Sequence, residues 1–98
     1  MIFYKKKLRF LVREISGVIY LVSKGECFEI NEVTNDILEF IRSKRTQKEI
    51  VDMLINSYRV DKNTAEEDVE NTLHELVAVG AVERMEEKSY HIAEYAGG

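Results

Sequence analysis

Few side chains in this sequence could do chemistry, and they are scattered along the chain. There are two histidines, His74 and His91, and a single cysteine, Cys27. Neither histidine has a second ligand at the spacing of a metal site, and no glycine-rich phosphate loop or nucleophile motif occurs. Cys27 could serve as a reactive thiol, although a small residue on a strand is the commoner role. The residues therefore give no reason to expect an enzyme, a metal or a cofactor.

The carboxylates are more numerous, and they form a run at Glu66, Glu67, Asp68 and Glu70. Consecutive residues point in different directions around a helix, so this run predicts a solvated face and not an acid–base pair. The charge is uneven, with a balance of +4 in residues 1–48 and −8 in residues 49–98, for a net charge of −4. Such polarity favours charged partners, or complementarity between two faces of the protein.

Length and composition indicate one small domain, residues 1–98. The hydrophobic fraction of 45% is ordinary for a globular protein, and 98 residues can bury only a modest core. No apolar run approaches the roughly 20 residues of a membrane helix, and the amino-terminal residues do not read as a signal peptide. One cysteine cannot form an internal disulfide. We expect a cytoplasmic protein with a core at residues 8–85 and a carboxy-terminal tail at 86–98.

The first third of the chain predicts an antiparallel meander of three strands. Residues 8–13 alternate between apolar and basic side chains, as a half-buried strand does. Residues 18–22 are apolar throughout, which is typical of a central strand covered on both faces. In residues 26–30, Phe28 and Ile30 share one face, and Cys27 and Glu29 share the other. Turn signals separate the three strands.

Three helices are expected after the meander. Asn31 is a suitable N-cap for the first, and residues 46–49 form a capping box that opens the second. Asp61 and Thr64 are both plausible caps for the third, and Gly80 is its expected end. Residues 81–85 add a short extended segment. The sequence thus predicts an α+β domain with a three-stranded sheet followed by three helices.

These elements, taken with their residues, resemble a known family. The segments that carry the resemblance are GVIYLV from Gly17, FEINE from Phe28, Ile37-Leu38, Arg45-Thr46, Glu49-Ile50, YRVD from Tyr58, Asp68-Val69, Leu73, Leu76, and GAV from Gly80. In order and spacing this pattern is similar to the PqqD family, the peptide-binding proteins of pyrroloquinoline-quinone biosynthesis. The same domain is called the RiPP recognition element, after ribosomally synthesised and post-translationally modified peptides. The family's usual Leu-Asn-Glu-Thr is replaced here by Ile-Asn-Glu-Val, and the tail from Glu86 matches nothing in the family.

The resemblance implies a winged-helix-like domain that binds the leader segment of a precursor peptide. The leader adds a strand beside the third strand, in a groove toward the third helix. The domain, itself no catalyst, presents the peptide to a modifying enzyme, such as a radical SAM maturase, or to a leader peptidase.

The third strand has the properties that strand addition requires. It is the last of a meander and therefore an edge, and residues 26–30 contain none of the Pro, Lys or bulge features that protect natural edges. The residues expected to contact the peptide are Cys27, Phe28, Glu29, Ile30, Asp68, Val69, Thr72, Leu73, Glu75 and Leu76. Two alternatives stay open. Phe28, Leu73 and Leu76 could be core residues only, and the edge could pair with a second copy of the chain, giving a homodimer, or with the tail.

A winged-helix nucleic-acid-binding protein is the rival prediction. Its third helix would meet phosphates, which require Lys or Arg, whereas residues 61–80 carry six acids against Lys62 alone. The basic residues Lys5, Lys6, Lys7 and Arg9 could contact nucleic acid, but a solubilising segment is the simpler interpretation. A structural adaptor without a peptide ligand is the third possibility.

Overall fold

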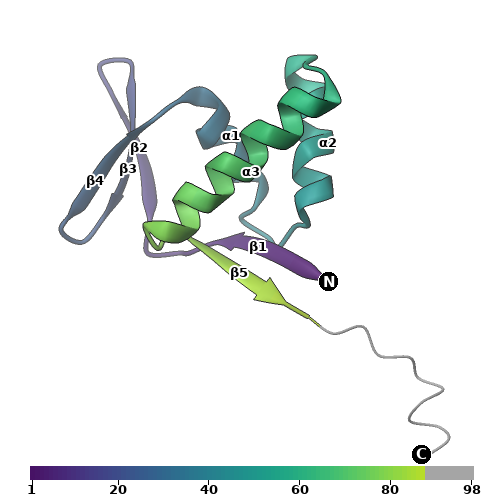
Figure 1. The fold of residues 1–98 in the computed structure, drawn as a ribbon. Coiled ribbons are helices and arrows are strands. Elements are labelled where there is room, and N and C mark those ends of the chain that lie inside the picture. Colours follow the sequence, from purple (N-terminus) through teal and green to yellow (C-terminus); the bar gives the residue numbers. More distant parts are fainter. Residues whose placement is uncertain (88–98) are drawn as a thin grey trace, which may run out of the picture.

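A computed structural model describes residues 1–87 of the chain. Five strands and three helices follow one another along these residues (Figure 1). They are β1 (Ile2–Lys6), β2 (Leu11–Ile15), β3 (Val18–Ser23), β4 (Glu26–Ile30), α1 (Glu32–Phe40), α2 (Gln47–Tyr58), α3 (Lys62–Ala78) and β5 (Val82–Glu86). The predicted α+β fold, with three antiparallel strands followed by three helices, is confirmed.

The three-stranded sheet has the order β2-β3-β4, and all its pairs are antiparallel. Ser16 and Gly17 connect β2 to β3 with φ angles of 52° and 82°, the two positive values that a type I′ hairpin turn needs. Gly25 supplies a further positive φ, of 80°, between β3 and β4. These two tight turns set the register of the whole sheet.

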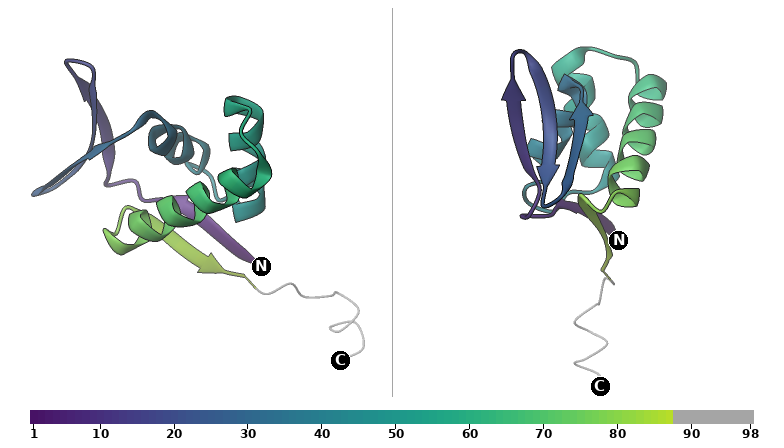
Figure 2. Two further views of the ribbon diagram at one scale, coloured as in Figure 1. Left: turned by 45° about the horizontal axis from the view of Figure 1, so that its top comes forward. Right: turned by 90° about the vertical axis from the view of Figure 1, so that its left-hand side faces the viewer.

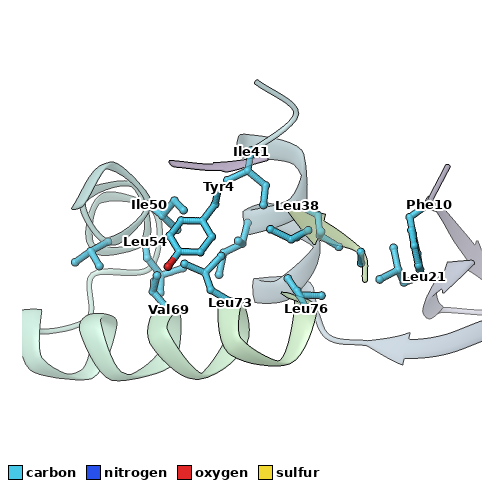
Figure 3. Packing of buried hydrophobic residues seen from close by; sticks show 14 of the residues in the cluster. Tyr4, Phe10, Leu21, Leu38, Ile41, Ile50, Leu54, Val69, Leu73 and Leu76 are labelled. Atoms are coloured by element: carbon cyan, nitrogen blue, oxygen red, sulfur yellow. The ribbon is translucent and has the colours of Figure 1, made fainter. Parts of the chain in front are cut away.

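The strand predicted at residues 8–13 is wrong at its beginning. Lys7 to Phe10 form a turn, closed by a 3.2 Å bond from the Phe10 N–H to the Lys7 carbonyl, and β2 starts only at Leu11. Leu8 is 84% exposed, while Phe10 is fully buried beside Leu21 (Figure 3). The alternating apolar residues at the start of this stretch therefore belong to a turn and not to a strand. Only Phe10 of that turn contributes to the core.

Coverage of β3 on both faces is also a wrong prediction. β3 is the central strand, but only Leu21 is buried. On the face away from the helices, Leu11 and Ile15 of the neighbouring strand are 47% and 61% exposed. The helices cover one face of this sheet and leave the other open.

A second sheet pairs the beginning of the chain with residues 82–86. β1 and β5 are antiparallel, with Tyr4 opposite Arg84, and Tyr4 also exchanges backbone hydrogen bonds with Arg45, of 2.8 and 3.0 Å. The extended segment expected near residues 81–85 is thus β5, but β1 was not predicted. The compact fold therefore starts at Ile2 and not at residue 8, and Glu86 belongs to β5 and not to a tail.

Local capping signals define where the helices begin. Asn31 Oδ1 accepts a 2.8 Å bond from the Thr34 N–H, and Thr46 with Glu49 forms the expected capping box of α2. Asp61, and not Thr64, caps α3, because its Oδ1 accepts from the Thr64 N–H at 3.0 Å. Hydrogen bonding lowers the pKa of Asp61, which keeps the cap charged.

The core lies between the helices and the inner face of the sheet. From α3, Ala65, Val69, Leu73 and Leu76 point into it, and the labelled ones can be followed in Figure 3. The right-hand view of Figure 2 looks along the molecule from the sheet side and places β4 as the strand nearest to α3. None of the helices in residues 1–87 is long and apolar enough to cross a membrane.

Candidate functional site

The outer edge of β4 is unpaired in the part of the chain that the structure describes. β4 stands at one end of the order β2-β3-β4, and its five residues pair only with β3. It contains neither Pro nor Lys. A row of main-chain donors and acceptors is therefore open to a further strand.

The register identifies which main-chain groups are open. The two-residue turn makes Ile15 and Val18 a hydrogen-bonded pair, and such pairs alternate along an antiparallel ladder. The main-chain groups of successive β3 residues therefore bond alternately to β2 and to β4. On β4, residues 26, 28 and 30 form the main-chain hydrogen bonds to β3. The N–H and C=O groups of Cys27 and Glu29 are left pointing to the free edge.

A groove separates this edge from α3. It is a hollow of about 270 Å³, lined by Leu21, Phe28, Glu29, Ile30, Asn31, Thr34, Thr72, Glu75, Leu76 and Val79. Six of the ten residues expected from the sequence are among them, namely Phe28, Glu29, Ile30, Thr72, Glu75 and Leu76. The strand and helix chosen from the sequence thus meet at one site.

Four lining residues were missed. Leu21 and Thr34 come from the neighbouring strand and from α1, and Asn31 is the helix cap. Val79, 36% exposed, follows Thr72, Glu75 and Leu76 at the i, i+3, i+4, i+7 spacing of one helical face. That spacing could have identified Val79 in the sequence.

The other four expected residues lie elsewhere. Val69 and Leu73 are 0% and 2% exposed and form part of the core. Asp68 is exposed on α3 but does not line the groove. The Cys27 side chain is exposed and points to the open face of the sheet, opposite Val22, so only its main chain faces the edge.

The groove combines an apolar floor with an acidic border. Leu76 is 5% exposed, and it forms the floor together with Leu21, Phe28 and Val79. A second hollow, of about 580 Å³, shares Glu29, Ile30 and Asn31 with the groove and is further lined by Glu14, Glu32 and Asp36. Negative charge therefore extends past the end of β4 to the beginning of α1.

A hydrogen bond between helices links α1, beside this acidic hollow, to α2. The Tyr58 hydroxyl, at the end of α2, donates to Asp36 Oδ2. That bond, followed by burial and the charge of Asp36, raises the pKa of Tyr58 to about 12. The tyrosine therefore stays protonated, and keeps donating, throughout the neutral range.

Within residues 1–87 no group of His, Cys, Asp and Glu side chains is arranged to hold a metal ion. His74 lies on α3, and His91 falls outside the described residues. The groove itself offers main-chain hydrogen-bonding groups, apolar contact and negative charge.

The fold and the groove together define a small α+β recognition domain. The family model for coenzyme PQQ synthesis protein D (PqqD) matches residues 16–82, and the chain belongs to this family. No curated protein sequence matches the chain.

Three solved structures share the fold. One is TbiB1 in complex with the TbiA(beta) leader peptide, at 25% identity and a TM-score of 0.67, covering 81% of this chain and 94% of that one. Another is lasso peptide synthetase B1 complexed with the leader peptide, at 17% identity and a TM-score of 0.67. The match covers 82% of this chain and 96% of that one. The third is the PqqD truncation of Methylobacterium extorquens PqqCD, a stand-alone RiPP recognition element, at 17% identity and a TM-score of 0.70. The match covers 83% of this chain and 88% of that one.

Proposed function

We propose that this protein binds the leader segment of a ribosomally made precursor peptide. The leader adds as a strand to the free edge of β4 and lies in the groove toward α3. Support comes from membership of the PqqD family and from the two similar structures that contain leader peptides. The observation that carries the proposal for this chain is the open β4 edge, which borders a groove with an apolar floor.

Main-chain pairing gives the peptide its position. A guest strand can exchange hydrogen bonds with the N–H and C=O groups of Cys27 and Glu29, each worth about 0.5–1.5 kcal/mol net. This pairing is indifferent to the guest's side chains, so it supplies affinity but little selectivity.

Selectivity comes from the alternating side chains of the guest. Every second side chain of an added strand points to the inner face, where Leu21, Phe28, Leu76 and Val79 offer apolar contact. Fully burying one Leu- or Phe-sized side chain contributes about 1.5–3 kcal/mol. The leader should therefore carry large apolar residues at alternate positions.

Negative charge adds a second criterion. Glu75 borders the groove, and Glu29, Glu32 and Asp36 line the hollow that continues from it. Exposed ion pairs are worth only about 0.2–1 kcal/mol each, but they speed encounter and select the register. A leader with Lys or Arg beside its apolar residues is favoured.

We further infer that residues 1–98 act as one non-catalytic recognition domain. It holds the leader while a separate enzyme, such as a radical SAM maturase or a leader peptidase, acts on the rest of the peptide. The similar PqqD truncation is itself described as functional and stand-alone, which supports this division of labour.

Titration of labelled leader peptides, taken from precursor genes beside the gene for this chain, tests the proposal. We expect dissociation constants below about 100 μM, or about −5.5 kcal/mol. If every leader binds more weakly than that, the proposal fails.

Nucleic-acid binding is disfavoured by the surface of α3. Glu66, Glu67, Asp68 and Glu70 are all exposed, so the helix that a winged-helix protein would place on DNA presents acids to the phosphates. Weak retention on heparin at low salt is expected. A homodimer paired through β4 would compete with the leader for the same edge, and addition of leader would then dissociate it.

A further inference from the structure

The opposite edge of the sheet carries a larger hollow, apart from the groove between β4 and α3. It has a volume of about 760 Å³ and lies between β2 and the end of α1. Its lining residues are Lys6, Leu8, Leu11, Val12, Arg13, Glu39, Arg42 and Ser43. None of them lines the groove between β4 and α3.

The charge of this hollow is positive, in contrast to the acidic groove. Three basic residues line it, against one acidic residue, Glu39. Glu39 already forms an ion pair with Arg42, with 3.1 Å between Oε1 and Nη1. Lys6 donates to the Phe10 carbonyl, and burial, followed by the charge of Arg42, lowers the pKa of Lys6. Among residues 1–87, Arg13 has no carboxylate within ion-pair distance. The hollow therefore offers positive charge that the described fold does not neutralise.

Apolar side chains are concentrated at the same edge. Of the five large hydrophobic residues exposed in residues 1–87, Leu8 and Leu11 line the hollow and Ile15 follows on β2. Together with Arg13 they form a surface that is apolar and basic at once. Exposed apolar side chains gathered in this way mark interaction sites.

The main chain of β2 is open as well. The register that leaves residues 27 and 29 free on β4 leaves Val12 and Glu14 free on β2, and nothing in residues 1–87 pairs with that edge. An extended segment could therefore lie along β2 with its side chains reaching the hollow.

We propose that this hollow docks an extended segment of a partner protein that carries acidic and large apolar side chains. Charge complementarity points to this occupant, because carboxylates suit Arg13 and Arg42 while the acids around the β4 groove repel such a segment. The β4 edge thus favours basic ligands and the β2 edge favours acidic ones, so both edges can be occupied at the same time. The inference stands on β2 and α1 and does not depend on leader binding.

A synthetic peptide of alternating Glu and Leu residues, titrated into the isotope-labelled chain, provides the test. We expect amide shifts at Leu8, Val12, Glu14 and Arg42 on adding it, and none there with a peptide of alternating Lys and Leu. The double variant Arg13→Glu with Arg42→Glu should weaken binding roughly ten-fold. Arg13 is exposed and the Arg42 side chain is 70% exposed, so the variant should fold, which its thermal unfolding checks.

A matched control separates local from overall charge. Lys24→Glu with Lys62→Glu changes the net charge equally at two exposed positions outside the hollow, and it should leave binding within about two-fold. An equal loss in both double variants overturns the proposal, as do shifts confined to β4 and α3 or no shifts at millimolar peptide. Self-association of the chain that the Arg13 and Arg42 reversals abolish would assign the hollow to a second copy and also overturn it.

Discussion

Phe28 of β4 and Leu76 of α3 meet in the floor of one groove, where Leu76 belongs to the hydrophobic core and Phe28 packs against it. The groove is therefore not a loop feature, because its floor is fixed by the same packing that stabilises the fold. A peptide that enters it meets a preformed surface and does not have to order it, which reduces the entropic cost of binding.

Thr72→Arg should obstruct the groove. Thr72 is half-buried on α3 and lines the hollow, so a long charged side chain there fills the space that an apolar leader residue would take. We expect leader affinity to fall at least about ten-fold, or about 1.4 kcal/mol, with the melting temperature nearly unchanged. Asn71→Arg, an adjacent exposed position that does not line the groove, is the control and should bind normally.

Proline substitution probes the main-chain pairing. Cys27→Pro removes one N–H that faces the free edge, and proline is tolerated on edge strands when its nitrogen faces outward. Leader binding should weaken about five- to ten-fold, in line with one lost hydrogen bond. Cys27→Arg, which keeps the N–H and points its side chain to the open face, should have little effect.

Glu14→Pro is the matched control for that substitution. It removes the equivalent outward N–H from β2, at the opposite edge of the same sheet. Its leader affinity should fall much less than that of Cys27→Pro, because the only loss is one exposed acid of the neighbouring hollow. Equal weakening by Cys27→Pro and Glu14→Pro would argue that proline disturbs the sheet as a whole.

Ionic strength tests the part played by the acids. Exposed ion pairs affect which leader is chosen but contribute little to affinity. We therefore expect leader binding to weaken only a few-fold between 50 and 500 mM salt. A protein with many phosphate contacts would lose roughly a thousand-fold or more. Glu75→Gln should reduce this dependence, whereas Asp68→Asn, outside the groove, should not. A flat salt response in all three proteins would leave the acidic face with solubility as its role.

Tyr58→Phe should change stability in the alkaline range. The folded protein raises the pKa of Tyr58 from its ordinary 10.0 to about 12, so the stabilisation is fully present below pH 10 and is lost as the pH rises toward 12. The difference in unfolding free energy between wild type and Tyr58→Phe should shrink across that window. A difference that stays constant from pH 9 to pH 12 would mean that the bond to Asp36 contributes nothing.

Local signals predicted most of the fold. The caps Asn31 and Thr46 and the hairpin turns depend on a few neighbouring residues, and the structure places them as expected. β1 was missed because its partner β5 lies at the other end of the chain, and no pattern within residues 2–6 reveals such a pairing. Leu8 shows the converse error, since an apolar residue in an alternating pattern turned out to lie in a turn.

The candidate site was predicted in outline but not side chain by side chain. Periodicity shows which face of α3 is apolar, but it does not show which part of that face meets the core and which borders β4. Val69 and Leu73 turn toward the core, while Thr72, Glu75 and Val79 border the groove. That division depends on how the helix is rotated against the rest of the fold, which only tertiary packing determines.

Amide hydrogen exchange, measured residue by residue with and without leader, tests strand addition to β4 most directly. In the free protein the Cys27 and Glu29 amides should exchange rapidly, because both face the open edge. With saturating leader both should slow at least about ten-fold, while the equivalent amides of Val12 and Glu14 on β2 keep their rates. If the leader binds and the Cys27 and Glu29 amides still exchange as fast as in the free protein, the peptide is not an added strand on β4.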